Sequence, residues 1–221
     1  MPAAPVRLAL FDCDGTLVDS QHHICTAMER AFGDVGLAPP PRAIIRRQVG
    51  LSLAEVIRSL LPDADGALHE RLVAQYRAAF FELRSAGTIG AEPLYPGIAK
   101  LLETLTTQGW QLGVATGKSD RGLAHILAHH GIARHFVTLQ TADRHPSKPH
   151  PAMIEAALVE AGAAAQDAVM IGDTSFDMAM AVSAGVRAIG VGWGYHPNDE
   201  LVAAGAIAVA EDVGELSAML A

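Results

Sequence analysis

The sequence predicts an α/β fold, a doubly wound (Rossmann-like) parallel sheet core into which an all-helical segment is inserted. Two observations lead to this prediction. Short, almost entirely apolar runs alternate with helical patterns over most of the chain, which is typical of a parallel sheet covered by helices on both faces. A block near the start breaks the alternation, because it has helical patterns and no convincing strand.

Six short apolar runs are expected to form the strands. Each has the length and composition of a buried parallel strand. The runs span residues 6–11, 110–115, 136–139, 168–171, 186–191 and 206–209. The expected core helices lie between or after them and span residues 98–108, 120–130, 151–161, 175–184 and 213–220.

The helical insertion, residues 20–92, follows the first strand. Amphipathic patterns predict consecutive helices over 21–32, 41–48, 53–61 and 67–84. We expect this segment to form a cap domain, with residues 1–19 and 93–221 forming the catalytic α/β core. The insertion contains eight arginines, no lysine and eight acidic residues, so it is neutral.

Composition excludes several classes of protein. The 221 residues carry a net charge of −8, which argues against a nucleic-acid-binding module and against a polybasic membrane anchor. Two cysteines are too few for a disulfide scaffold or a zinc cage. No apolar run approaches the roughly 18 residues of a spanning helix, and the first residues lack the pattern of a signal peptide. We therefore expect a cytoplasmic protein with no nucleic-acid or membrane partner.

Polar residues stand where several predicted strands end. Asp12 and Asp14 are two residues apart, so their side chains leave an extended chain on the same side. Gly15 then lets the backbone turn and offer N–H groups to an anion. Thr116 and Asp173 end two other strands, and ligands of doubly wound sheets bind outside the carboxyl ends of the strands.

This set of residues is suited to phosphoryl transfer. Clustered carboxylates need a cation, and a few hard oxygen ligands suit Mg²⁺. Lys148 lies in a loop that opens a helix, where the helix start favours anions and the lysine adds a positive charge. A carboxylate beside Mg²⁺ and a lysine is a plausible nucleophile for a phosphoryl group, and the adjacent carboxyl group can exchange protons with the leaving oxygen and with water.

Four motifs strengthen this interpretation. They are D-C-D-G-T-L-V-D-S at 12–20, A-T-G-K at 115–118, S-K-P-H-P at 147–151 and I-G-D-T-S-F-D at 171–177. In this order and at this spacing, the chain resembles the haloacid-dehalogenase-like phosphatase superfamily. A helical cap between the first two motifs, together with L-Y-P-G at 94–97, resembles the subgroup that contains phosphoglycolate phosphatase.

The resemblance implies the metal and proton-transfer residues. Asp12 matches the nucleophile, which is also a Mg²⁺ ligand. Asp14 matches the general acid and base, with its backbone carbonyl on the metal. Asp173 matches the remaining protein ligand of Mg²⁺.

The resemblance also implies the phosphate-binding residues. Thr116 and Gly117 match contacts to the phosphate, in addition to the turn at Gly15. Lys148 matches the group that stabilises the developing phosphoryl charge, and Asp177 matches a second carboxylate near Lys148.

The expected substrate is a small phosphorylated metabolite, with 2-phosphoglycolate, hydrolysed to glycolate and phosphate, as the first candidate. Its carboxylate could be held by the fork of an arginine, and Arg46 and Arg47 are our candidates. Gly50 resembles the glycine of a specificity loop in the cap. These arginines could equally lie on a solvated helix face.

Other functions stay open at this point. The substrate could be a sugar phosphate, a nucleoside monophosphate or pyrophosphate. The chain could also be a sugar-phosphate mutase, although mutases use both Lys and Arg of the cap and the insertion has no lysine. A phosphoaspartate signalling module uses similar residues, but it would be shorter and would need no Asp14. The protein could be a monomer or a homodimer.

Two local expectations concern neighbours of these motifs. Lys118 is expected to be solvated. Asp19 and Ser20 are expected to cap the helix that follows them.

Overall fold

A single parallel sheet forms the centre of the protein. The computed structural model describes residues 5–221, and its six strands are ordered β3-β2-β1-β4-β5-β6, all parallel. The strands are β1 (Leu8–Phe11), β2 (Gln111–Thr116), β3 (Phe136–Thr141), β4 (Ala168–Gly172), β5 (Arg187–Val191) and β6 (Ala208–Ala210). Every strand expected from the apolar runs is present, so the predicted fold class is confirmed.

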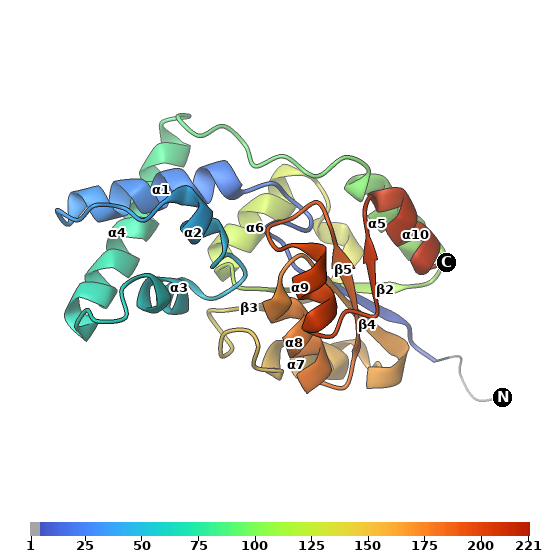
Figure 1. Ribbon diagram of the computed structural model, residues 1–221. Coiled ribbons are helices and arrows are strands. Elements are labelled where there is room, and N and C mark those ends of the chain that lie inside the picture. Colours follow the sequence, from blue (N-terminus) through green and yellow to red (C-terminus); the bar gives the residue numbers. More distant parts are fainter. Residues whose placement is uncertain (1–4) are drawn as a thin grey trace.

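Helices cover both faces of this sheet (Figure 1). One face is packed by α5 (Ile98–Thr107), α6 (Asp120–His129) and α10 (Val213–Met219). The other is packed by α7 (Ala152–Ala161), α8 (Ser175–Ser183) and α9 (Asn198–Ala203). Two short 3₁₀ helices, η1 (Ala133–His135) and η2 (Ala165–Asp167), precede β3 and β4. Helix α9 was not expected from the sequence, because its six residues are too few to show a periodic pattern.

Strand β1 shows why this core is stable. It pairs with β2 on one side and β4 on the other. Ala9 and Phe11 belong to the hydrophobic cluster of one sheet face, and Leu8 and Leu10 to that of the other. All four are fully buried, as expected for side chains that alternate between two covered faces. The residues after Phe11 therefore extend from the end of a rigid central strand.

The helical insertion packs around a hydrophobic cluster of its own. Its helices are α1 (Gln21–Asp34), α2 (Arg42–Arg46), α3 (Leu53–Leu60) and α4 (Gly66–Ser85). The cluster draws all its buried members from this segment, among them Met28, Ile57 and Leu72. In Figure 1 these helices lie to one side of the sheet. We propose residues 20–92 as a separate domain on this basis, with boundaries at 19/20 and 92/93.

Among residues 5–221, no helix is both long enough and apolar enough to cross a lipid bilayer.

Candidate active site

Three adjacent strand ends bring the predicted site residues together. Asp12 follows β1, Thr116 ends β2 and Asp173 follows β4, and these strands are neighbours in the sheet. The Asp12 N–H donates to the Ile171 carbonyl at 2.9 Å, so the strand pairing holds Asp12 in place. All three polar side chains are buried, so each needs a hydrogen-bond partner or a counter-ion to offset the cost of its burial.

Lys148 lies between two of the carboxylates. Its Nζ is 2.9 Å from Asp12 Oδ1 and 2.6 Å from Asp177 Oδ1, and its side chain is fully buried. Burial alone would lower the pKa of this lysine, but the charges of Asp12 and Asp177 outweigh burial and raise it. The group is therefore an ammonium ion that is held directly beside Asp12.

Asp177 has a second task at the start of α8. Its Oδ2 accepts hydrogen bonds from the Thr174 N–H at 3.1 Å and from Thr174 Oγ1 at 2.7 Å. This reciprocal capping arrangement satisfies N–H groups at the helix start. The structure thus places Asp177 against Lys148, while its hydrogen bonds to Thr174 fix the direction of its carboxylate.

Asp12 has one engaged oxygen and one free one. Oδ1 accepts from the Cys13 N–H at 2.6 Å as well as from Lys148. Oδ2 is buried and has no hydrogen-bond partner among residues 5–221. Burial raises the pKa of Asp12 to about 7, against the opposing charge of Lys148. A buried carboxylate oxygen without a partner is costly, so it calls for a cation or a proton.

Asp173 completes an acidic cluster suited to a cation. Its carboxylate accepts from Thr16 Oγ1 at 2.7 Å and from the Tyr195 N–H at 3.0 Å. Burial, with the negative charge of Asp12 nearby, raises the pKa of Asp173 well above its ordinary value. Oxygens of Asp12, Asp173 and Asp177 lie within 4.8 Å of one another. This donor set of hard oxygens fits Mg²⁺, and the free Asp12 Oδ2 is the atom that most needs it.

Gly15 is required for the turn that follows Asp14. Its φ is +89°, and a Cβ there would lie 2.1 Å from Asp173 Oδ2, so no other residue fits without displacing the acidic cluster. The N–H of Gly15 donates to the Val18 carbonyl at 2.9 Å. The turn thus uses the N–H of Gly15 itself, and a role of Gly15 in phosphate binding stays a prediction that rests on the turn it allows.

Asp14 is held by groups that the sequence analysis placed elsewhere. Its Oδ1 accepts from Ser20 Oγ and lies 2.8 Å from Lys118 Nζ. Lys118 also pairs with Glu92 at 3.3 Å, and its side chain is only 10% exposed. The expectation that Lys118 is solvated is thus wrong. The capping expectation is met by Asp19, whose Oδ1 accepts from the Gln21 N–H at 3.2 Å. Ser20 makes no side-chain cap hydrogen bond to α1, because its hydroxyl donates to Asp14.

Glu92 links this network to the end of the insertion. Arg84, at the end of α4, contacts its Oε2 at 2.7 Å. Burial opposes ionisation of Glu92, but Lys118 and Arg84 outweigh burial and hold its pKa below the ordinary value. The Lys118 pKa is raised for the complementary reason, since Asp14 and Glu92 outweigh its burial. Asp14 therefore lies in a chain of buried charges that reaches into the insertion.

A loop of the insertion lies directly on the strand ends. A Cβ at Gly117 would be 2.4 Å from the Leu51 carbonyl oxygen and 2.5 Å from that of Gly50. The Ser52 N–H donates to Ser147 Oγ at 2.8 Å. Gly117 is thus required by close packing of the insertion backbone, and Gly50, with φ +104°, turns that backbone over the site.

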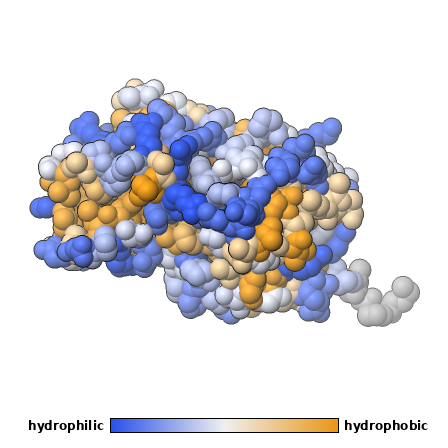
Figure 2. Space-filling model, in the orientation of Figure 1, coloured by the Kyte–Doolittle hydropathy of each residue, from blue (hydrophilic) through white to orange (hydrophobic). Residues whose placement is uncertain are grey.

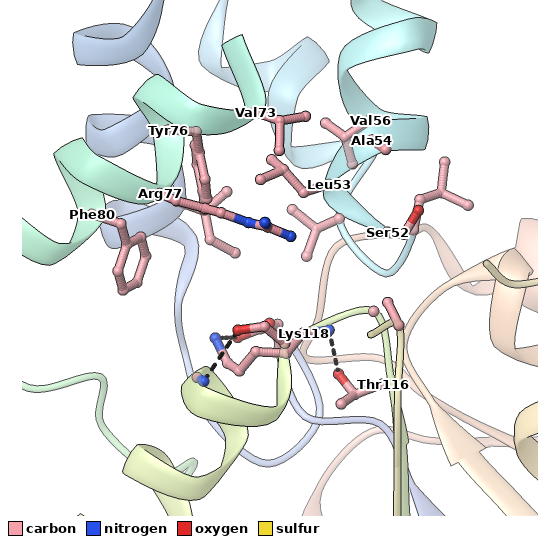
Figure 3. Close-up of a pocket in the computed structure, with 18 of the residues that line it drawn as sticks. Ser52, Leu53, Ala54, Val56, Val73, Tyr76, Arg77, Phe80, Thr116 and Lys118 are labelled. Atoms are coloured by element: carbon pink, nitrogen blue, oxygen red, sulfur yellow. Dashed lines mark hydrogen bonds and ion pairs between the residues drawn. The ribbon is translucent and has the colours of Figure 1, made fainter. Parts of the chain in front are cut away.

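A cavity of about 500 Å³ lies between core and insertion. Asp12, Asp14, Thr116 and Gly117 line its core side. The Thr116 hydroxyl oxygen accepts from the Lys118 N–H at 3.2 Å, which leaves the hydroxyl proton to be donated. In Figure 3, Thr116 and Lys118 lie on one side of this cavity, and side chains of the insertion lie on the other.

The two predicted substrate arginines lie elsewhere. Within residues 5–221 neither Arg46 nor Arg47 is among the residues that line the cavity. Arg46 donates to the side chain of Gln21, and Arg47 forms an exposed ion pair with Glu200 at 2.7 Å. Figure 2 shows a hydrophilic band on this face, where the insertion meets the core. The alternative of a solvated helix face is thus the one that fits the geometry.

Two arginines of the insertion that were not predicted as site residues line the cavity. Both come from α4: Arg77 and Arg84. Arg84 is paired with Glu92, whereas Arg77 extends into the cavity in Figure 3. Their spacing of seven residues places them on one helix face, which is the signal that could have found them.

Comparison with known proteins agrees with this architecture. The family model described as "Haloacid dehalogenase-like hydrolase" matches residues 9–191. The chain is 37% identical over 204 residues to "Probable phosphatase IndB" of Dickeya dadantii, covering 89% of this chain and 86% of that protein. It is 29% identical over 222 residues to "Phosphoglycolate phosphatase" of Pseudomonas putida, covering 97% and 80%.

The fold also matches solved structures. A predicted phosphatase from Clostridium acetobutylicum superposes with a TM-score of 0.87 at 26% identity, over 98% of this chain and 99% of that one. The likeness extends over the sheet and the insertion together, because nearly the whole of both chains is covered.

Proposed function

The chain belongs to the haloacid dehalogenase-like hydrolases and is a phosphatase of that family. We propose that it is a Mg²⁺-dependent enzyme that hydrolyses a small phosphate monoester through an aspartyl-phosphate on Asp12. The observation that carries the proposal is the buried contact of Lys148 with both Asp12 and Asp177 at the strand ends. It keeps a nucleophilic carboxylate and a fixed positive charge side by side where a phosphoryl group would enter.

In the first step the Asp12 carboxylate attacks phosphorus. A bond forms between a carboxylate oxygen and phosphorus, and the bond between phosphorus and the ester oxygen breaks. Asp14 gives its proton to that leaving oxygen, so a neutral alcohol departs. Lys148 and the Thr116 hydroxyl face the charge that develops on the phosphoryl oxygens.

In the second step water replaces the enzyme on phosphorus. Asp14, now a carboxylate, takes a proton from water, and the resulting hydroxide attacks the aspartyl-phosphate. The bond between phosphorus and Asp12 breaks, which releases inorganic phosphate and restores the Asp12 carboxylate. Ser20 and Lys118 hold Asp14 in one orientation for both transfers.

Asp12 and Asp173, with the backbone carbonyl of Asp14, would hold the Mg²⁺ ion. When bound, the ion neutralises the carboxylates and the phosphate, so that an anionic nucleophile can approach an anionic substrate. The buried, unpartnered Asp12 Oδ2 supports this assignment.

The names of several relatives suggest 2-phosphoglycolate as the substrate. Its carboxylate would need a cation from the insertion. Since Arg46 and Arg47 do not line the cavity, Arg77 is the residue of the insertion placed to supply it. The kcat/KM for 2-phosphoglycolate should be compared with the values for sugar phosphates, nucleoside monophosphates and pyrophosphate.

Phosphate release from p-nitrophenyl phosphate tests the proposal. We expect many turnovers with Mg²⁺ and a loss of turnover with EDTA that added Mg²⁺ restores. A single labelling event from acetyl phosphate, with no turnover, would contradict the proposal and favour a phosphoaspartate signalling module. Turnover that EDTA does not change would contradict the metal dependence alone.

A further inference from the structure

The hydrophobic cluster of the insertion is incomplete on the side that faces the active site. Several of its apolar side chains pack on the cluster but are only half-buried, and the same side chains line the cavity: Ile24, Leu51, Leu53, Val73 and Tyr76. An apolar surface left open in this way favours an apolar occupant, because covering it removes it from water.

This apolar wall and the catalytic carboxylates belong to one cavity. Asp12 and Asp14 line it together with Leu53 and Val73. Figure 3 shows Leu53, Val56 and Val73 on one side, with Thr116 and Lys118 opposite. A phosphoryl group on the core side would direct the rest of the substrate toward the insertion. The volume of about 500 Å³ lies within the range of about 300–1,000 Å³ that is typical of pockets for drug-sized ligands.

The positively charged side chains around the wall are poorly placed to bind the carboxylate of a small substrate such as 2-phosphoglycolate. Among the other cations that line the cavity, Arg84 and Lys118 hold Glu92 within the protein. Arg121 is exposed, and its guanidinium lies over the ring of Phe81. Arg77 enters the cavity, but its side chain is 64% exposed and lies 3.9 Å from Asp143. A guanidinium that is solvated and shared with a carboxylate gives a weak site for a second carboxylate.

We infer that the preferred substrate is a phosphate monoester of an apolar alcohol, whose alkyl or aryl body packs against the apolar wall formed by Ile24, Leu51, Leu53, Val73 and Tyr76. The inference rests on the proposed phosphatase function and specifies its substrate class. The phosphate would be bound by the core, and the affinity for the alcohol would come from burial of apolar surface under the insertion.

A series of alkyl phosphates tests the inference without changing the chemistry at the ester oxygen. With ethyl, butyl and hexyl phosphate, kcat/KM should rise about fourfold for each methylene group, from the free energy of about 0.8 kcal/mol per buried CH₂. Hexyl phosphate should also exceed 2-phosphoglycolate in kcat/KM.

A variant locates the effect on the wall. Val73→Thr keeps the shape of the side chain but places a hydroxyl in the apolar surface, so kcat/KM for hexyl phosphate should fall about fivefold more than that for ethyl phosphate. Val159→Thr is the matched control, because Val159 is 82% exposed on α7 of the core. It should change neither value.

The outcomes separate this inference from the proposed function. A flat alkyl series with intact phosphate release would overturn the substrate class and leave the phosphatase standing. A preference for 2-phosphoglycolate that is lost in Arg77→Met would also overturn the substrate class. It would show that Arg77 binds the carboxylate of that substrate. Failure to hydrolyse any of these esters would overturn the proposed function, and this inference with it.

Discussion

The core and the insertion face each other across the cavity with different kinds of side chain. On the core side, buried charges are paired over short distances, as in the contacts of Lys148 with Asp12 and Asp177. On the insertion side, the cavity wall is mostly apolar, and most ion pairs of the insertion lie on its exposed surface, such as that of Arg42 with Glu29. The difference indicates that the core supplies the reaction and the insertion supplies selection.

This contrast predicts that substitutions on the two sides of the cavity have effects of different size. A buried ion that loses its partner keeps its desolvation cost, so substitutions in the core cluster should have large effects. Exposed pairs are screened by water and contribute little. Effects of substitution should therefore decrease from the core outward.

Removal of the nucleophile should have the largest effect. Asp12→Asn should lower kcat by about 10³-fold or more, because the amide cannot form the aspartyl-phosphate. Steady-state phosphate release measures this, with the exposed Asp63→Asn as the control for the same chemical change. A variant that keeps more than a tenth of the activity would show that Asp12 is not the nucleophile.

Loss of the proton donor should depend on the leaving group. Asp14→Asn should lower kcat/KM for an alkyl phosphate by about 10²- to 10⁴-fold. The loss should be smaller for p-nitrophenyl phosphate, because nitrophenolate departs without a proton. Equal losses for both esters would contradict the role of Asp14 as general acid.

The buried charge chain that joins core and insertion should be important for stability. Lys118→Met leaves Asp14 and Glu92 without their shared cation, so the free energy of unfolding should fall by about 3–5 kcal/mol. Adding Glu92→Gln should recover part of this loss, because it removes a buried charge that keeps only Arg84 as a partner. Urea unfolding measures both, with the exposed Lys100→Met as control. Strictly additive losses would contradict the coupling.

Protons should compete with Mg²⁺ for the acidic cluster. The pKa of Asp12 is raised to about 7, above its unfolded value, so the metal-free protein loses stability as pH rises from about 4 to 7. Above pH 7, Mg²⁺ binds an ionised carboxylate, whereas at pH 6 it must displace a proton at a cost of about 1.4 kcal/mol per pH unit. The increase of Tm with Mg²⁺ should therefore be larger at pH 8 than at pH 6. The same increase at both pH values would contradict this competition.

The exposed ion pair between the two regions should have the smallest effect. Arg47→Ala removes the pair with Glu200, whose side chains are 43% and 37% exposed, and should cost less than about 1 kcal/mol of stability. Its kcat/KM should change less than threefold. A tenfold loss for 2-phosphoglycolate would instead restore Arg47 as a substrate residue.

The strands and the site residues of the core were easier to predict from the sequence than the contacts of the insertion. The strands were predictable because each is an almost uninterrupted apolar run, and residues such as Asp12, Thr116 and Asp173 stand directly at the strand ends. Once the strands are parallel, their ends must meet at one edge, so the site follows from local pattern and topology together. The contact of Lys148 with Asp177 does not follow in this way, because neither residue ends a strand. It was expected only from the resemblance to the family.

The contacts made by the insertion were less predictable. Lys118 is buried because Glu92, 26 residues earlier in the chain, lies against it, and nothing within A-T-G-K signals this. Ser20 stands where a helix cap is expected, yet its hydroxyl donates to Asp14. The apolar spacing of Leu53 and Val73 predicts packing within the insertion, but it does not reveal which side chains remain half-buried toward the cavity.

The most direct test of the account is to trap the covalent intermediate. Wild-type protein with Mg²⁺ and substrate is quenched in acid within a single turnover, digested and examined by mass spectrometry. We expect a phosphoryl adduct on the peptide that contains Asp12, and none in Asp12→Asn. An adduct on Asp173 or Asp177, or turnover in which no residue becomes phosphorylated, would contradict it.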